Sequence, residues 1–460
     1  MKSFRTFCLV LFTCGLAAAV TGAAGFQGSA VRMHVAGYGN AQRVPEADAP
    51  GLRVPESAGG IAGTRQVFKP AADLAEAHAG LSAFMVAKKA GTDGESSSSE
   101  PRTNRSDKFW KSDDLNILAI GMGVGDVDGD GKNDIVVIDP THVYLYRFSA
   151  GTMALISEYS SGNLELKCVD VAKMRKEGPA RIYVTAQNRG NVESFVLEFR
   201  NGKLVPVIEA VSYFLRVILY PTHGPILLGQ KKGLGKMYEG GVYRLTDKGD
   251  SLEVQGRFGI PLKIPVFGFA IGDLLGNGSP LIAVYDKNDH LRIYTPAGKK
   301  LFVTRDYYGG SDVILRWAGP EGRQFSAGTD EESEVVFFRP RILCLDLDGN
   351  GVYEILVSKH HSKTLRMMSR TKLLEEGQIE GLLWNGDSLE ELWSIPKIQG
   401  TVTDFAVDTL PGLVGRRLIT LERKKTDWFS FLRSRSQVRA YDLDEVIDES
   451  KKGERRERRL

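Results

Sequence analysis

A motif that recurs along the chain constrains the fold more strongly than any other feature of the sequence. Val124–Gly131 reads VGDVDGDG and leads into the apolar run Asp134–Val137, and Cys344–Gly351 reads CLDLDGNG and leads into Glu354–Val357. Both copies join a tight acidic turn to a short β-strand. Self-similarity of this kind indicates a repeat architecture, in which one supersecondary unit is used several times along the chain.

Further copies are weaker and are recognised mainly by their spacing. Ile271–Gly278 is an eroded copy of the loop, and Asp170 and Asp408 head copies that we interpret as having lost it. A sixth copy falls near Arg216–Gly229. The distances between copies bracket the roughly 40–50 residues of a propeller repeat with added loop insertions.

Signals for short β-strands dominate the chain around these motifs. Short alternating or apolar runs are separated by turn residues, and dipeptides such as Asn201-Gly202 and Asn385-Gly386 stand at hairpin positions. Repeats of this size cannot bury their faces alone, so a closed ring in which neighbours cover one another is the physical solution. We therefore predict an all-β protein, a β-propeller of six or seven four-stranded blades over residues 108–445.

The N-terminal region differs from the repeats. Lys2 and Arg5 precede an uncharged run and then small residues, which predicts a signal peptide over residues 1–23. Residues 24–107 are rich in Ala, Gly, Pro and Ser, which predicts a disordered, low-complexity flexible spacer before the propeller. A retained membrane anchor and lipidation at Cys14 are the alternatives to cleavage. The expected locations of the exported protein are the periplasm, the cell surface or the extracellular space.

The rest of the composition narrows the range of partners. Residues 446–460 form a dense charge run, which we interpret as a solvated tail. The chain has 60 basic and 57 acidic residues without a sustained basic stripe inside the repeats, so we expect no nucleic-acid partner. No segment after the signal peptide is long and apolar enough for a transmembrane helix in the mature chain.

Two cysteines remain once the signal peptide is removed. Cys168 and Cys344 each stand two residues before an aspartate, which predicts matching sites in different repeats. Such sites lie too far apart for a disulfide, so we expect two buried thiols.

The acidic loop at Asp126 offers the ligands that calcium prefers. Calcium takes six to eight oxygen atoms, and alternate positions of this loop place carboxylates on one side of a tight turn. Four carboxylates this close would repel one another without a cation. We predict a structural calcium site whose ligands are Asp126, Asp128, Asp130, Asp134 and the backbone carbonyl of Lys132.

A second, weaker calcium site is predicted in the other sharp copy of the motif. It offers the same arrangement with less charge, from Asp346, Asp348, Asn350, Glu354 and the carbonyl of Val352. The loop at Asp273 lacks two of the carboxylates, so we expect a metal-free turn there. The Asp126 loop is not an EF-hand, because no glutamate stands at its twelfth position and a strand, not a helix, follows it.

The acidic loop followed by a strand and a hairpin resembles the FG-GAP/VCBS repeats of integrin α-subunit propellers and of many exported bacterial proteins. The resemblance covers roughly residues 115–445 and is sharp in the loops at Asp126 and Asp346. It implies a bacterial, exported propeller that works in adhesion or protein contacts. This implication comes from the fold and not from a recognised site.

Three classes of function stay open. The leading hypothesis is a non-catalytic, calcium-stabilised propeller that serves as a binding or scaffold module in the cell envelope or outside the cell. Its partner would be another envelope or extracellular protein or a polysaccharide. One alternative is an enzyme, a lyase or hydrolase that acts on an extracellular polymer at the central channel. The other is an envelope assembly or sensor component.

No catalytic or cofactor-binding residue is assigned, because the sequence contains no Ser-His-Asp, Cys-His or zinc-binding pattern with persuasive spacing. The adjacent histidines His360 and His361 point to opposite faces if they lie on a strand, and we interpret them as a solvated pair in a loop.

Overall fold

The computed structural model describes six stretches of the chain, residues 109–233, 237–260, 264–316, 336–361, 374–424 and 435–448. Every described residue belongs to one unit of the chain, Ser96–Leu460. The expected signal peptide and spacer lie outside the described residues, as does most of the expected charged tail. Within these stretches, no helix is long and apolar enough to cross a membrane.

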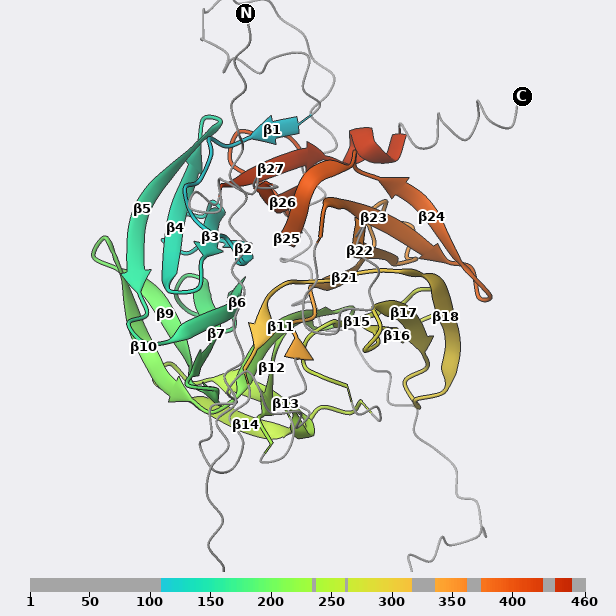
Figure 1. Ribbon diagram of the computed structural model, residues 1–460, viewed down its shortest axis with the longest axis horizontal. Helices are drawn as coiled ribbons and strands as arrows, with labels where there is room; N and C mark the ends of the chain where they lie inside the picture. Colours follow the sequence, from blue (N-terminus) through green and yellow to red (C-terminus); the bar gives the residue numbers. More distant parts are fainter. Residues whose placement is uncertain are drawn as a thin grey trace, which may run out of the picture. The chain divides into compact units, whose positions relative to one another are not determined.

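Six four-stranded antiparallel blades follow one another around a common axis in the described unit, as Figure 1 shows. The innermost strands of blades 1 to 6, numbered in chain order, are β2 (Gly121–Gly125), β6 (Glu165–Ala172), β11 (Phe214–Tyr220), β15 (Phe269–Gly272), β21 (Ile342–Leu345) and β25 (Ile398–Asp408). The second strands are β3 (Asp134–Ile138), β7 (Arg181–Asn188), β12 (Gly224–Lys231), β16 (Leu281–Tyr285), β22 (Glu354–His361) and β26 (Arg417–Lys424).

The outer half of each blade is a further pair of strands. The third strands are β4 (His142–Ser149), β9 (Ser194–Arg200), β13 (Glu239–Asp247), β17 (His290–Tyr294), β23 (Glu376–Trp384) and β27 (Ser436–Asp442). The outermost strands are β5 (Thr152–Ser160), β10 (Lys203–Val211), β14 (Leu252–Arg257), β18 (Lys300–Tyr307), β24 (Leu389–Ser394) and β1 (Phe109–Lys111). Two short additions, β8 (Asn191–Val192) beside β7 and the pair β19 (Ile314–Leu315) and β20 (Val336–Phe337), complete the described strands.

The last blade is completed by the first strand of the described chain. β1 pairs with β27, with Phe109 opposite Tyr441 and Lys111 opposite Arg439. Trp110 then reaches blade 1, where its Nε1 donates to the carbonyl of Gly151 at 2.7 Å and its ring meets Phe148 edge-on. The two ends of the ring are therefore joined by backbone pairing and by a side chain.

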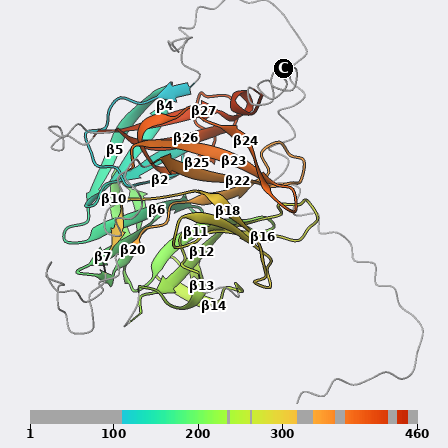
Figure 2. The same ribbon diagram turned by 45° about the vertical axis from the view of Figure 1, so that its right-hand side comes forward.

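Blades 5 and 6 are also continuous with each other. β25 pairs with β23 through Glu376 and Gly377, so that the two blades form one eight-stranded sheet with β1. Figure 2 shows β27, β26, β25, β23 and β22 side by side in this sheet.

Six clusters of buried hydrophobic side chains hold the ring together, one at each junction between neighbouring blades. Facing pairs, in order around the ring, include Val136 and Ile182, Tyr183 and Leu227, Phe214 and Phe269, Ala283 and Ile355, Leu356 and Phe405, and Ile419 and Met122. A strand such as β3, which has neighbours on both faces, is buried along its whole length. Outermost strands such as β18 are mostly exposed. The predicted all-β propeller is confirmed, with six blades in the described part of the chain.

Candidate functional site

The loops that join the innermost strand of each blade to its second strand lie on one face of the ring, because the innermost strands all run in the same direction along the axis. We call this the loop face. In the Asp126 loop (residues 126–133), the Asp126 carboxylate accepts hydrogen bonds from the backbone N–H groups of Gly129 at 2.7 Å and Gly131 at 3.2 Å. Both glycines have positive φ angles, 82° and 80°, a backbone conformation that residues with a side chain rarely adopt.

The same turn recurs in the other two recognisable copies. Asp346 accepts from the N–H groups of Gly349 at 2.7 Å and Gly351 at 2.9 Å. Asp273 accepts from the N–H of Gly278 at 2.7 Å. The leading aspartate therefore shapes the loop in each copy, whether or not the other carboxylates are present.

Carboxylates gather at the tip of the Asp126 loop. Asp126, Asp128 and Asp130 each place one oxygen within 4.8 Å of the others, and this is the group among the described residues that could hold a metal ion. Two cations compete for the same oxygens, because Arg147 forms an ion pair with Asp128 and Lys132 Nζ lies 3.9 Å from Asp130.

The fourth predicted carboxylate, Asp134, lies beneath the loop and not at its tip. It is 2% exposed, and its Oδ2 accepts from the N–H groups of Val127 at 3.2 Å and Asp128 at 3.3 Å. Burial, together with the nearby charge of Asp128, raises the pKa of Asp134 to about 6. The atoms that could bind a metal ion here are carboxylate oxygens in a tight turn, and oxygen atoms are the type of ligand that calcium prefers. Lys132 takes part through its N–H, which donates to Asp130 at 2.8 Å.

At the predicted second site, the side chains form hydrogen bonds with one another and with the backbone of the loop. Asn350 Nδ2 donates to Asp348 Oδ2 at 3.1 Å, and Asn350 Oδ1 accepts from the N–H of Val352 at 2.6 Å. Glu354 is buried, its carboxylate accepts from the N–H of Leu347 at 3.0 Å, and burial raises its pKa. Fewer carboxylate oxygens are left at the tip of this loop than at the Asp126 loop.

The position of Asp134 in blade 1 is occupied by a basic residue in two other blades. The first residue of the second strand pairs with the end of the innermost strand, and it is Asp134 in blade 1 and Glu354 in blade 5. At the same register stand Arg181 in blade 2 and Arg417 in blade 6. An arginine there cannot contribute to a cation site.

Both arginines form ion pairs within the fold. Arg181 Nη1 binds Asp247 at 2.7 Å, and Arg417 Nη1 binds Asp442 at 2.9 Å. In blades 2 and 6, an arginine therefore stands where blades 1 and 5 have a carboxylate, and this arginine forms an ion pair with an aspartate of the same chain.

The same register corrects the prediction that two further residues match Asp126 as the leading aspartate of a repeat. Asp408 is the last residue of β25, opposite Arg417. Asp170 lies inside β6, opposite Tyr183, because β6 continues to Ala172 before the loop begins. Asp170 therefore faces the ring axis and not the loop face.

A pocket of about 360 Å³ opens along the axis, and innermost strands of all six blades contribute to its lining. Its inner end is formed by Met122, Asp170, Arg216 and Arg341, and its rim by Lys173, Leu219 and Pro225, which are exposed. The side walls are apolar, with Val171, Ile218, Phe269, Leu343 and Ala406 among them.

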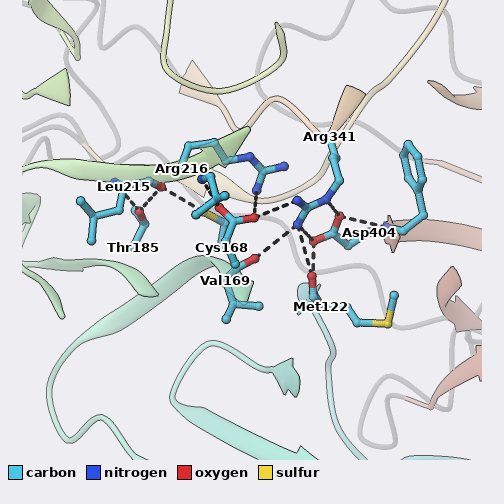
Figure 3. Close-up of polar contacts among 11 residues, drawn as sticks. Met122, Cys168, Val169, Thr185, Leu215, Arg216, Arg341 and Asp404 are labelled. Atoms are coloured by element: carbon cyan, nitrogen blue, oxygen red, sulfur yellow. Dashed lines mark hydrogen bonds and ion pairs between the residues drawn. The ribbon is translucent and has the colours of Figure 1, made fainter. Parts of the chain in front are cut away.

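Arg341, which directly precedes β21, binds three other blades across the axis (Figure 3). Its Nη1 lies 2.8 Å from Asp170 Oδ1, and its Nε lies 2.9 Å from Asp404 Oδ1. Its Nη2 donates to the carbonyl oxygens of Met122 and Val169, each at 3.3 Å. Although burial opposes the charge, the carboxylates of Asp404 and Asp170 raise the pKa of Arg341.

Sequence reasoning missed this network. The usable signal was a charged residue in the interior of several innermost strands, Asp170 in β6, Arg216 in β11 and Asp404 in β25. A charge in a buried strand is costly unless it is paired, so such residues predict partners.

The histidine pair is placed differently from the prediction. His360 and His361 both lie on β22, and the two do face opposite ways, with His360 buried and His361 exposed. The expected solvated loop is wrong for His360, whose Nδ1 lies 2.7 Å from the Gly309 carbonyl and whose Nε2 accepts from the Val402 N–H at 3.1 Å. At His360, β22 pairs with β23 through Gly377, and the backbone of Gly309 and Val402 encloses the imidazole ring, which explains the burial.

The two thiols are buried and free, as expected. Their registers differ, because Cys168 lies opposite Thr185, deep in β7, and Cys344 lies opposite Ile355, near the start of β22. The prediction of matching sites is therefore wrong. Burial raises the pKa of Cys168 to about 12, which keeps this thiol protonated.

Comparison with protein-family models found none that matches the chain, and comparison with curated proteins found no match. Among solved structures, the chain is similar to two crystal structures of BBS1N in complex with ARL6DN, one soaked with mercury and one with lead. The identities are 10% and 12%, and the TM-scores are 0.37 and 0.40. Each match covers 73% of this chain, with 97% and 98% of the other chain. The description of the fold rests on the strand pairing and the junctions between blades.

Proposed function

We propose that this chain is a non-catalytic propeller that binds another protein through its loop face, with calcium in the Asp126 loop as a structural support. The observation that carries the proposal is Leu275. The loop of blade 4 keeps the turn made by Asp273, yet the position of Asp128 in blade 1 and Asp348 in blade 5 is taken by Leu275, which is 40% exposed. A leucine held in water at the tip of a rigid turn is suited to a contact with another protein.

A second apolar side chain stands on the same face. Val414, in the loop between β25 and β26, is 80% exposed. Hydrogen bonds connect the loops of blades 4, 5 and 6, because Asp273 accepts from the Tyr353 N–H at 3.0 Å and Arg416 donates to the carbonyl of Asp346 at 3.3 Å. Leu275 and Val414 are therefore presented by one continuous, bonded surface.

The channel supports a binding role over catalysis. The described groups at its inner end are arginines and carboxylates that form ion pairs with one another, and burial keeps the thiol of Cys344 in its lining protonated. A hydrolase or lyase would need an acid and a base aimed at a shared substrate. The resemblance to FG-GAP/VCBS repeats and the predicted N-terminal signal peptide support a place in a bacterial cell envelope or outside the cell.

Site-specific photocrosslinking tests the contact. A photoreactive amino acid at position 275 or 414 is expected to capture the same protein in cells, and Leu275→Asp with Val414→Asp is expected to abolish the capture. Position 254 is the matched control, because Val254 is 46% exposed on the outer strand β14. Capture at position 254 as strong as at 275, or capture unaffected by the two substitutions, contradicts a contact through the loop face.

A further inference from the structure

The pocket on the ring axis contains a buried cation whose hydrogen-bonding capacity is unused. Arg216, on β11, is 4% exposed and lines the inner end of the pocket. Its Nη1 has no hydrogen-bond partner among the described residues. Its ion pair with Asp170 Oδ1 is long, at 3.4 Å, outside the usual range of a charged hydrogen bond.

The carboxylate of Asp170 is shared with other donors that lie closer to it than Arg216 does. Asp170 Oδ1 is held by Arg341 Nη1 at 2.8 Å, and its Oδ2 accepts from the N–H of Val217 at 2.8 Å. The other carboxylate of the network, Asp404, binds Arg341 and the N–H of Met122 and is not among the residues that line the pocket. The inner end of the pocket therefore presents two guanidinium groups and one carboxylate.

The mouth of the pocket carries charges of both signs. Asp126 accepts hydrogen bonds from Gly129 and Gly131 within its own loop, and Asp408 accepts from Asn133 Nδ2 at 2.8 Å. Lys173 adds a positive charge. Basic and acidic side chains balance in the described lining, so what favours an anion is the unpartnered Nη1 of Arg216 and not an excess of positive charge.

We propose that this pocket binds a small carboxylate with a compact apolar body, and that Arg216 receives the carboxylate. A guanidinium presents paired donors that match the two oxygens of a carboxylate. The apolar walls formed by residues such as Ile218, Phe269 and Leu343 cover the rest of the ligand. A volume of about 360 Å³ lies within the range of sites for small molecules. The site goes beyond the proposed protein contact and depends on neither that contact nor calcium.

Calorimetric titration of the full chain with benzoate and with benzamide tests the inference. Both ligands have the same ring, and only benzoate carries the charge. Saturable binding of benzoate at one site is expected, with no binding of benzamide over the same concentrations. Arg216→Gln is expected to weaken benzoate binding at least tenfold, and Arg216→Lys less. Arg244→Gln, an exposed arginine on β13 of the same blade, is the matched control.

A second variant tests the same pocket in case Arg216→Gln fails to fold. Leu219 is an exposed residue of the rim, so Leu219→Trp is expected to fold and to narrow the entrance, which weakens benzoate binding and places a fluorescent reporter beside it. Equal binding of benzoate and benzamide, benzoate binding unchanged by Arg216→Gln, or the lack of saturable benzoate binding to the native chain each overturns the proposal.

Discussion

Arg341 and Asp170, 171 positions apart in the sequence, share an ion pair of 2.8 Å at the axis of the ring. The same guanidinium binds Asp404, so one side chain of blade 5 fixes two carboxylates from blades 2 and 6. Asp170 and Asp404 are both buried, and neither could remain charged at low cost without this partner. The centre of the ring therefore depends on a single residue.

Replacing Arg341 by methionine is expected to destabilise the propeller by about 3–5 kcal/mol, because buried Asp404 loses its counter-charge and Asp170 keeps only the long ion pair with Arg216. Urea unfolding at neutral pH measures this loss. Arg341→Met combined with Asp404→Asn is expected to recover much of the stability, since Asp170 and Arg216 still pair and no buried charge is left without a partner. If the double variant is less stable than Arg341→Met alone, the ion pairs are not the reason for the loss.

His360 is expected to make stability fall as the pH drops below its ordinary pKa of about 6.5. Burial lowers the pKa of His360, so the folded state binds its proton later than the unfolded state does. Stability from this residue is therefore fully present above pH 6.5 and declines below it. Asp312 and Asp289 favour the charged form and reduce the effect.

Melting temperatures of the native chain and His360→Gln between pH 8 and pH 5 isolate this contribution. A glutamine amide can donate to Gly309 and accept from Val402 without titrating. Buried carboxyl groups with raised pKa values, such as Glu380 and Glu422, act in the opposite direction in both proteins and cancel in the difference. Parallel pH profiles for the two proteins contradict the assignment of a neutral His360.

Calcium is expected to raise the stability of the chain, by about 2.7 kcal/mol at a free concentration one hundred times the dissociation constant. Asp128→Ala and Asp130→Ala are expected to remove most of this gain, because each takes one oxygen from the group at the loop tip. Asp250→Ala is the matched control, an exposed aspartate in the turn before β14. Thermal melts in calcium and in chelator measure the effect, and an equal response in all four proteins is evidence of no site at this loop.

The sequence was a good guide to features that depend on neighbouring residues. The turns at Asp126, Asp273 and Asp346 were predictable because each aspartate binds backbone groups only a few residues ahead of it. Blade boundaries followed from the same turns and from hairpin signals. The sequence could not determine which residues of a strand face the axis, because a bulge between Leu166 and Cys168 shifts the register of β6.

The network at the axis was beyond sequence reasoning for a related reason. Arg341, Asp170 and Asp404 belong to three blades, and each finds its charged partner far away in the sequence. Their pairing depends on the closure of the ring, which no local pattern encodes. Arg216 could have been noted as a charge in an apolar strand, but its unused donors are visible only once the partners of Asp170 are known.

The pairing of β1 with β27 has a consequence for the order of folding. Phe109 cannot find Tyr441 until almost the whole propeller has been synthesised, and contacts of such sequence separation are slow because the intervening chain must first be ordered. Blades 1 to 5 contain all their strands before Ser436–Asp442 has been made, whereas blade 6 does not. Until then β1 is a strand edge without its partner, so the growing chain has an interval in which a chaperone, or a second chain, can take the place of its own last strand.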